Sequence, residues 1–135
     1  MSFEELRHTA DVKMRVHADT TGALFSDACM ALMQVIYGND RKPGITKKIS
    51  LDAPDIESLL SDFLSEVLFI TEVECFVIAR AEVTIAGLHL EATLDGELFD
   101  PLRHNKGTEV KGISYSGLVI QKENGGYTLE ILFDV

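Results

Sequence analysis

The first hydrophobic residues of the chain alternate with polar ones. An apolar side chain recurs at every second position from Val12 to Ala18. A period of two is typical of a strand that buries one face. We therefore predict a strand over residues 12–18, with a shorter strand over Phe3–Leu6 before it and residues 8–11 as the connection.

Two later stretches repeat with a period of about 3.6 residues, which predicts amphipathic helices. The first helix runs from Gly22 to Tyr37, where Thr20 or Thr21 can cap its start and a Gly-Asn-Asp sequence ends it. The second helix runs from Ile56 to Thr71, with Asp55 as the expected N-cap. Each helix carries a broad apolar face, so both are expected to pack on the core.

The remaining pattern is that of strands separated by turns. The expected strands are Lys47–Leu51, Cys75–Ala79 with Glu82–Ile85, Leu88–Leu94, Glu109–Ile120 and Tyr127–Asp134. A loop is predicted from Asp95 to about Thr108, and Asn124-Gly125 is typical of a hairpin turn. Since the strands cluster late, the order β-β-α-β-α-β-β-β-β predicts one α+β domain over residues 1–135. Its two helices would pack on a mostly antiparallel or mixed sheet.

The composition is that of a globular protein with a strong acidic excess. Of the 135 residues, 46% are hydrophobic and 25% are charged, and 22 acidic side chains against 12 basic ones give a net charge of −10. A surface this acidic repels nucleic-acid phosphates, so stable direct binding of RNA or DNA is not expected. A basic protein partner or a cation suits this charge better.

Three features of the sequence bear on location. No run of about 18 apolar residues is present, so no membrane span is expected. The N-terminal residues lack the basic and apolar regions of a signal peptide. Cys29 and Cys75 lie in apolar runs without metal-ligand spacing, which indicates two buried thiols in a reducing compartment. We therefore expect a cytoplasmic protein.

Carboxylates near both ends of the chain are the first candidates for chemistry. Asp11 follows His8 by three positions, and Asp134 lies at the end of the last predicted strand. Val135 adds the main-chain carboxylate if it is the natural terminus. A hard divalent cation prefers carboxylate and water oxygens, and these three residues can supply them. The alternative is that they are ordinary solvated acids on an acidic surface.

Glu109 and Lys111 are a second candidate pair, because residues two apart on a strand project from one face. They form either an exposed ion pair of little energetic weight, or a lysine poised for a phosphate beside an acid. With a two-residue hairpin turn, Asp134 falls opposite Tyr115, which places Lys111 roughly 13 Å further along. We therefore place a cation at Asp11 and Asp134, and treat Glu109 and Lys111 as a neighbouring rim.

Other patterns of catalytic or metal-binding sites give little. The sequence has no C-x-x-C, no H-E-x-x-H, no EF-hand loop and no glycine-rich phosphate loop before a helix. His104 lies in the predicted loop, where a single histidine is either solvated or part of a partner-facing surface. No arrangement of serine or cysteine with histidine indicates a catalytic nucleophile.

Four short segments, in this order, resemble the archease family. They are His8-Thr9-Ala10-Asp11, His104 in its loop, Glu109-Val110-Lys111-Gly112-Ile113-Ser114-Tyr115 and Phe133-Asp134-Val135. The resemblance extends over the whole length, including the helix that begins after Asp55. Two positions depart from the family: Arg7 stands where an acid is usual, and Ser116 where a histidine is usual. Any role of that histidine is therefore absent here.

The resemblance implies an accessory protein of an RtcB-type RNA ligase, which joins RNA ends in tRNA splicing and repair. Such a protein is not itself an enzyme; it promotes GTP-dependent guanylylation of the ligase and multiple turnover. The resemblance also implies a divalent cation (calcium, magnesium or manganese) held by Asp11 and Asp134, with Val135 contributing its terminal carboxylate. The residues expected around it, facing the partner or a phosphate, are His8, His104, Glu109 and Lys111.

Two other classes of function stay open. One is a chaperone or solubility modulator of RNA-modifying enzymes such as tRNA methyltransferases, which predicts an exposed apolar patch and activity independent of Asp11. The other is a small metal-dependent phosphoesterase, which predicts turnover by the protein alone. No general base is evident beside the carboxylates for that second class.

Overall fold

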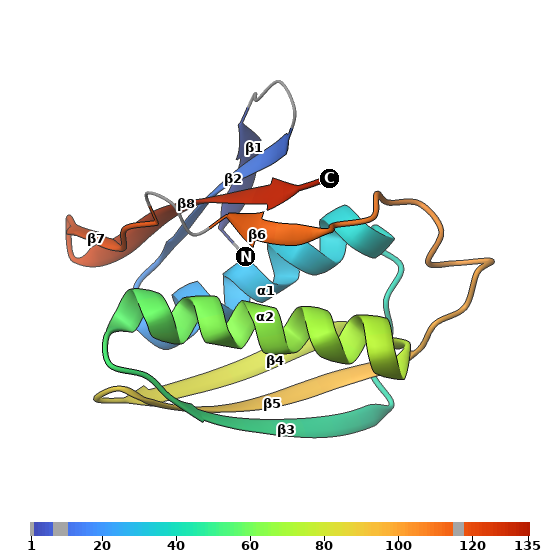
Figure 1. The fold of residues 1–135 in the computed structure, drawn as a ribbon, viewed down its shortest axis with the longest axis horizontal. Coiled ribbons are helices and arrows are strands. Elements are labelled where there is room, and N and C mark those ends of the chain that lie inside the picture. The colour runs from blue at the N-terminus through green and yellow to red at the C-terminus, as the bar shows by residue number, and fades with distance from the viewer. Residues whose placement is uncertain (1, 7–10, 115–117) are drawn as a thin grey trace.

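The computed structural model of the chain describes residues 2–6, 11–114 and 118–135. Two antiparallel sheets enclose a middle layer of two helices (Figure 1). The predicted α+β class, with two helices and mostly antiparallel strands, is confirmed. The strands divide into two sheets, however, and all of the described strand pairs are antiparallel, so the mixed sheet is not formed.

The larger sheet is built around the last strand of the chain. Its strands are β1 (Phe3–Leu6), β2 (Asp11–Ala18), β6 (Gly112–Ser114), β7 (Gln121–Glu123) and β8 (Gly126–Asp134). The order β1-β2-β8-β6 places β8 between β2 and β6, while β7 pairs with the beginning of β8. Segments from the two ends of the chain therefore lie side by side in this sheet.

The smaller sheet contains three strands in the order β3-β5-β4. They are β3 (Ile45–Asp52), β4 (Phe76–Ala86) and β5 (His89–Leu98). β5 continues past Gly96, where the sequence predicted a loop. A side chain at Gly96 would meet the carbonyl oxygen of Val77 at 2.1 Å, beside the irregularity between Ile78 and Arg80 in β4. Glycine is needed there for close approach of two backbones, not for a turn.

The two helices start at the predicted caps. In α1 (Thr21–Tyr37) the Thr20 hydroxyl accepts a hydrogen bond from the backbone N–H of Ala23 at 3.1 Å. In α2 (Ile56–Glu74) the Asp55 carboxylate accepts one from Ser58 at 2.8 Å, which lowers the pKa of Asp55. Both caps satisfy an amide that has no partner within the helix.

The core lies between the layers and takes side chains from both helices and both sheets. Its largest fully buried members include Phe25, Phe63, Phe76 and Phe133. Phe25 of α1 stacks on Phe63 of α2 with ring centroids 6.1 Å apart, which joins the two helices. In the part of the chain that is described, no helix is long and apolar enough to cross a membrane.

Two further predictions are wrong. Of the described residues in the long strand predicted over Glu109–Ile120, only Gly112–Ser114 pair as a strand. Gln121–Glu123, just after the predicted range, form a separate short strand. Cys75 is exposed, because it ends α2 in the left-handed conformation with φ of 53°, whereas Cys29 is buried as predicted. The apolar run around Cys75 therefore belongs to the strand that follows it.

Candidate functional site

Asp11 and Asp134 face each other across the pair of strands β2 and β8. The register places Asp11 opposite Asp134 and Val12 opposite Phe133. Phe133 is fully buried, and side chains alternate between the two faces of a sheet, so both aspartates lie on the outer face. Since residues directly opposite have neighbouring side chains, the sheet brings two carboxylates from opposite ends of the chain together.

The strand on the other side of β8 adds Lys111 and Gly112. Gly112 pairs with Asp134, and the backbone N–H of Lys111 donates a hydrogen bond to the Asp134 carbonyl at 2.7 Å. The prediction that Lys111 lies about four residues beyond Asp134 is therefore wrong. Asp11, Asp134 and Gly112 form one row across three strands.

The register error has a specific origin. β7 pairs with β8 in the register that the two-residue turn predicts, with Gln121 opposite Thr128. Further along, Ser114 lies opposite Leu132. Ser114 and Gln121 are seven positions apart in the sequence, whereas their partners Leu132 and Thr128 are four apart, so this side of the pair holds three more residues than a continuous ladder. A single bulge adds one residue, so this insertion exceeded what the pattern predicted.

The row of Asp11, Asp134 and Gly112 opens onto a hollow of about 330 Å³. Its lining residues are Asp11, Gly112, Ile113, Ser114, Leu132 and Asp134. A Cβ atom at Gly112 would meet nothing within 4 Å and would point to the same side as Asp134. The glycine therefore leaves open space beside the Asp134 carboxylate.

The chemistry of this hollow fits a hard cation. Like charges directly opposite on a sheet are destabilising, and a bound cation would relieve that repulsion. Carboxylate oxygens are the ligands preferred by calcium, magnesium and manganese. Among the described residues, no group of three or more His, Cys, Asp and Glu side chains gathers at one point. His8 lies outside the described residues.

The other predicted rim residues separate into two environments. Glu109 and Lys111 are exposed on either side of Val110, which is buried, so both point to solvent next to the end of β8. Val135 follows Asp134, and its side chain is partly buried against the core. Of these residues, Lys111 has the direct connection to the aspartate row, through its backbone hydrogen bond.

His104 is not part of a surface, so its predicted partner-facing role is wrong. Its side chain is 1% exposed and packs against the rings of Tyr37 and Phe99 at 6.0 and 5.9 Å. The backbone N–H of Asp100 donates to Nδ1 at 2.9 Å, so Nε2 carries the proton and donates to Glu97 at 3.0 Å. His104 thus holds its own loop.

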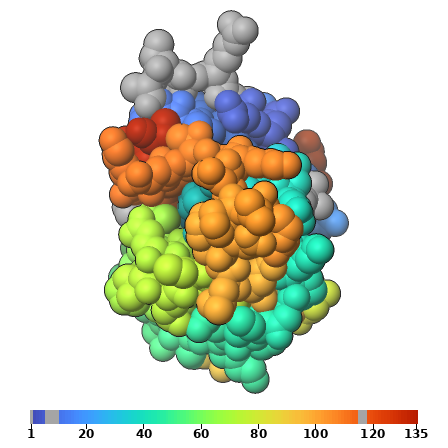
Figure 2. Space-filling model, turned by 90° about the vertical axis from the view of Figure 1, so that its right-hand side faces the viewer, coloured from blue at the N-terminus to red at the C-terminus, as the bar shows by residue number. Residues whose placement is uncertain are grey.

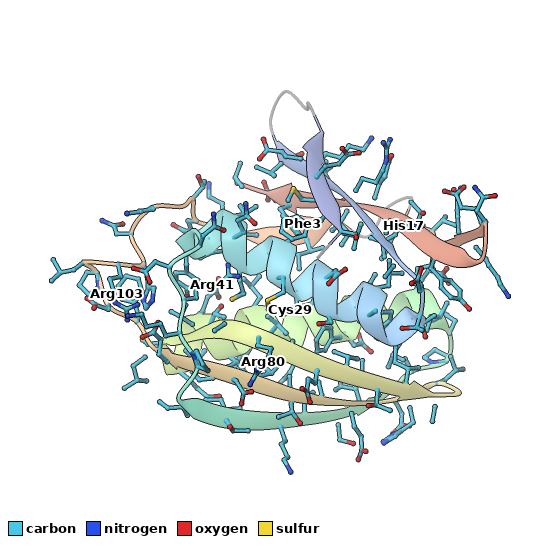
Figure 3. All side chains as sticks on the ribbon, turned by 180° about the vertical axis from the view of Figure 1, so that it is seen from behind. Phe3, His17, Cys29, Arg41, Arg80 and Arg103 are labelled. Carbon is cyan, nitrogen blue, oxygen red and sulfur yellow. The ribbon has the colours of Figure 1, made fainter. Side chains whose placement is uncertain are left out.

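Arg103 lies at one end of the molecule (Figure 3). Glu97 connects it to His104. Its carboxylate accepts hydrogen bonds from Arg103, from the backbone N–H of Lys42 at 2.7 Å and from His104. The Arg103 guanidinium is the main cause that lowers the pKa of Glu97 to about 2. Sequence patterns missed Glu97, because it lies in the stretch that was predicted as a loop.

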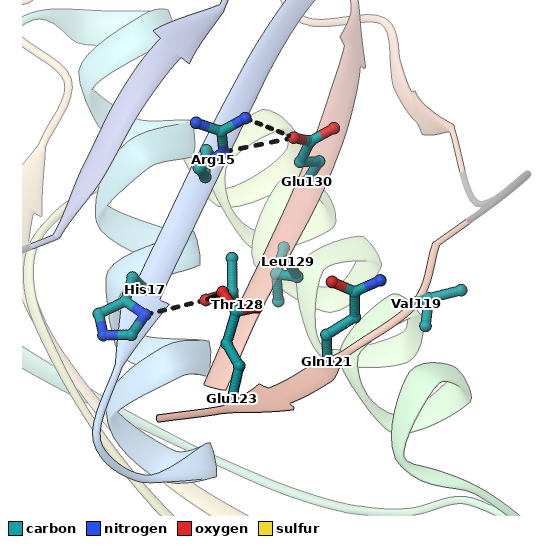
Figure 4. Close-up of a pocket in the computed structure, with 8 residues that line it drawn as sticks. All are labelled: Arg15, His17, Val119, Gln121, Glu123, Thr128, Leu129 and Glu130. Atoms are coloured by element: carbon teal, nitrogen blue, oxygen red, sulfur yellow. Dashed lines mark hydrogen bonds and ion pairs between the residues drawn. The ribbon is translucent and has the colours of Figure 1, made fainter. Parts of the chain in front are cut away.

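The outer face of β2 and β8 also carries paired polar side chains, and Figure 4 shows Arg15 with Glu130 and His17 with Thr128. Glu130 accepts from Arg15 at 3.0 Å and from Lys13 at 3.1 Å, and these contacts lower the pKa of Glu130. His17 lies 2.9 Å from the Thr128 hydroxyl. Because Lys13 and Arg15 are neutralised by carboxylates, this face offers little free positive charge for a nucleic acid.

The chain is similar in sequence to one family of known proteins. Residues 3–135 match the model of the Archease protein family (MTH1598/TM1083). The chain is 34% identical to a protein archease of Pyrococcus furiosus, with 98% of each chain covered. It is 32% identical to a protein archease of Methanosarcina mazei, with 98% of this chain and 95% of that protein covered.

Two solved structures share the fold. The solution structure of Methanobacterium thermoautotrophicum protein 1598 has a TM-score of 0.83 at 24% identity and 99% coverage of both chains. The crystal structure of an archease of Thermotoga maritima, described as a possible chaperone, has a TM-score of 0.65 at 16% identity. It covers 98% of this chain and 96% of that one.

Proposed function

The chain belongs to the archease family, and from that premise we propose that it is an accessory protein that activates an RtcB-type tRNA-splicing RNA ligase. It is not itself an enzyme in this proposal. It promotes GTP-dependent guanylylation of the ligase and so supports multiple turnover in the cytoplasm.

The observation that carries the proposal is the pairing of Asp11 with Asp134 on the outer face of the sheet. Two carboxylates beside an open hollow can share a calcium, magnesium or manganese ion. In a protein that ends at Val135, the main-chain carboxylate would be a third oxygen donor. When bound, such an ion supplies positive charge that neutralises phosphate oxygens during transfer.

The residues around the aspartates have complementary tasks. Gly112 keeps the space beside Asp134 open for phosphate or for a group of the ligase. Lys111 is exposed next to Asp134 and can offset phosphate charge as the aspartates approach a site filled with triphosphate. The two carboxylates and the lysine therefore present both signs of charge at one edge.

The net charge fits a protein partner with a basic cleft. At −10 the chain is attracted to a positively charged RNA-binding surface, and such attraction raises the rate of encounter more than the affinity. Stable direct binding of RNA is not part of the proposal, since Lys13 and Arg15 of the outer face are paired with Glu130.

The proposal is tested by mixing the purified protein with its cognate ligase, GTP and a divalent metal, and following guanylylation of the ligase. We expect acceleration by the wild type, a lower maximal acceleration with Asp11→Ala and with Asp134→Ala, and an unchanged maximum with Glu82→Ala. Glu82 is exposed on the smaller sheet and serves as the matched control. Equal activation by all four proteins would refute the cation role.

A second candidate is a chaperone for RNA-modifying enzymes, which exposed apolar side chains favour. Phe69, Val73 and Leu102 are exposed by 54%, 62% and 89%. A chaperone of this kind would suppress aggregation of a client equally well with Asp11→Ala. Light scattering of a heat-treated client protein with and without this variant distinguishes the two candidates.

A further inference from the structure

One end of the molecule carries an exposed apolar surface that the aspartate row does not explain. Five of the large hydrophobic side chains that the structure describes as exposed come from the end of α2 and from β5 with its following loop. We call them the apolar end: Phe69, Val73, Leu98, Phe99 and Leu102. Exposed apolar groups gathered in this way are typical of protein interaction sites.

Backbone contacts bring these side chains to one place. Phe69 and Val73 are four residues apart on α2 and so lie on one side of the helix. The backbone N–H of Phe99 donates to the carbonyl of Cys75, the cap of α2, at 2.8 Å. Leu98 lies opposite Phe76 in the register of β5 with β4. The helix end and the strand end are therefore joined.

The loop that carries Leu102 is held in position by polar contacts at its surface and by the buried His104. Asp100 accepts a hydrogen bond from the backbone N–H of Leu102 at 3.0 Å and also pairs with Arg103. The buried His104 connects the loop to Glu97 at 3.0 Å. These contacts present an 89% exposed leucine at a fixed place. A surface ordered before binding loses less conformational entropy when a partner docks.

Acidic residues border the apolar end on the helix side. α2 contains acidic residues but no lysine or arginine. Glu72 and Glu74 lie in its last turn, where negative charge opposes the helix dipole and costs stability. Lys47 pairs with Glu74. The pKa of Tyr37 is raised chiefly by burial of its side chain, and the charge of Glu72 adds to this effect. The exposed carboxylate of Glu72 at the C-terminal end of α2 suits a partner with basic groups.

The loop that carries Leu102, the end of α2 and the C-terminal end of β8 are visible from the same side of the molecule. Figure 2 shows the loop of residues 99–107 at the centre, the end of α2 beside it and the C-terminal end of β8 above. Residues 109–114 lie between the loop and β8 in this view. A single partner of ordinary size can therefore contact both surfaces at once.

We propose that the apolar end is the docking surface for the ligase, where it fits an apolar depression bordered by lysine and arginine side chains. This inference rests on the activator function proposed above. Leu102 and Val73 supply most of the binding energy, and Glu72 selects the basic border of the partner. The aspartate row acts on the guanylylation step once the apolar end is engaged.

The test uses the full chain and its cognate ligase, and measures guanylylation rate against activator concentration. The double variant Val73→Gln/Leu102→Gln removes two exposed side chains without adding charge. We expect its half-maximal concentration to rise by about tenfold or more with an unchanged maximum, because a polar amide in place of an apolar hot spot weakens binding. Leu88→Gln, at an exposed leucine in the turn between β4 and β5, is the matched control and keeps the wild-type value.

Each outcome separates the inference from the proposed function. Asp134→Ala lowers the maximum and leaves the half-maximal concentration in place if both proposals hold. Activation by the wild type with equal half-maximal concentrations for wild type and double variant overturns the docking surface alone. The docking proposal is also overturned if sedimentation shows that the wild type is a dimer and the double variant a monomer, while both activate the ligase equally. No binding and no activation by the wild type overturns the activator function together with its partner.

Discussion

Asp11 and Asp134 are direct cross-strand neighbours on the outer face of the larger sheet. Their repulsion in the absence of a cation predicts a measurable gain on neutralisation. Asp134→Asn should raise the free energy of unfolding by about 0.2–1 kcal/mol in EDTA, since like charges opposite on a sheet are destabilising. Thermal unfolding in EDTA measures this directly. If Asp134→Asn is less stable than the wild type, the Asp134 carboxylate makes favourable contacts that outweigh its repulsion with Asp11.

The same variant should lose its response to metal. Calcium or manganese at millimolar concentration is expected to raise the Tm of the wild type, because a ligand that binds the folded state stabilises it by mass action. Asp134→Asn should show little of this rise, whereas Glu82→Gln should retain it. An equal rise in all three proteins would place the metal elsewhere.

Two glycines in strands should respond in opposite ways to a larger side chain. Gly112→Val should leave the free energy of unfolding nearly unchanged, since a Cβ there meets nothing within 4 Å. It should lower activation of the ligase, because the new side chain stands beside Asp134 in the hollow. Gly96→Ala should instead destabilise the fold by about 1–3 kcal/mol, since its Cβ would overlap the Val77 carbonyl at 2.1 Å. Urea unfolding and the guanylylation assay measure the two effects.

Glu97 should make folding sensitive to acid. Hydrogen bonds, first from Arg103, hold the pKa of Glu97 at about 2, below its ordinary value of 4.5. A lowered pKa in the folded state stabilises the protein fully above pH 4.5, and this stabilisation is lost as the pH falls towards 2. Glu97→Gln should therefore be less stable than the wild type at neutral pH, and the difference should shrink across this window. Urea unfolding at several pH values measures the gap, and a constant gap would contradict the prediction.

The two cysteines should differ strongly in reactivity. Burial raises the pKa of Cys29 to about 12, whereas Cys75 is exposed at the end of α2. A thiol reagent such as DTNB should modify one group rapidly in the native protein and the second only on unfolding, because the thiolate is the reactive form. Cys75→Ser should remove the rapid phase. A rapid phase that persists would mean that Cys29 becomes accessible in the native state.

The elements with a regular pattern could be predicted from the sequence. Period and caps gave both helices, including Thr20 and Asp55, because these signals are local. The positions of Asp11 and Asp134 at strand ends also follow from local pattern, but their pairing across β2 and β8 does not. The division into two sheets does not, because the same alternation occurs in both and nothing in it identifies the partner strand.

The errors arise where a residue is explained by a distant contact. The extra residues between Ser114 and Gln121 keep an apolar and polar mixture that reads as one strand. The buried His104 is hydrogen-bonded to Glu97. Glu97 was predicted in a loop because Gly96 precedes it. Gly96 in turn is explained only by the approach of Val77 from another strand. Each of these depends on tertiary structure that no local pattern contains.

The central place of β8 has a consequence for how the molecule assembles. β2 and β8 are paired although they are far apart in the sequence: the contact between Arg15 and Glu130 spans 115 residues. Contacts of this sequence separation form slowly, since a large loop must close first. On the ribosome, β1 and β2 emerge early but remain without their central neighbour until synthesis reaches the last strand. The carboxylate pair is therefore created only when the larger sheet closes, so a nascent or truncated chain that lacks β8 cannot present it.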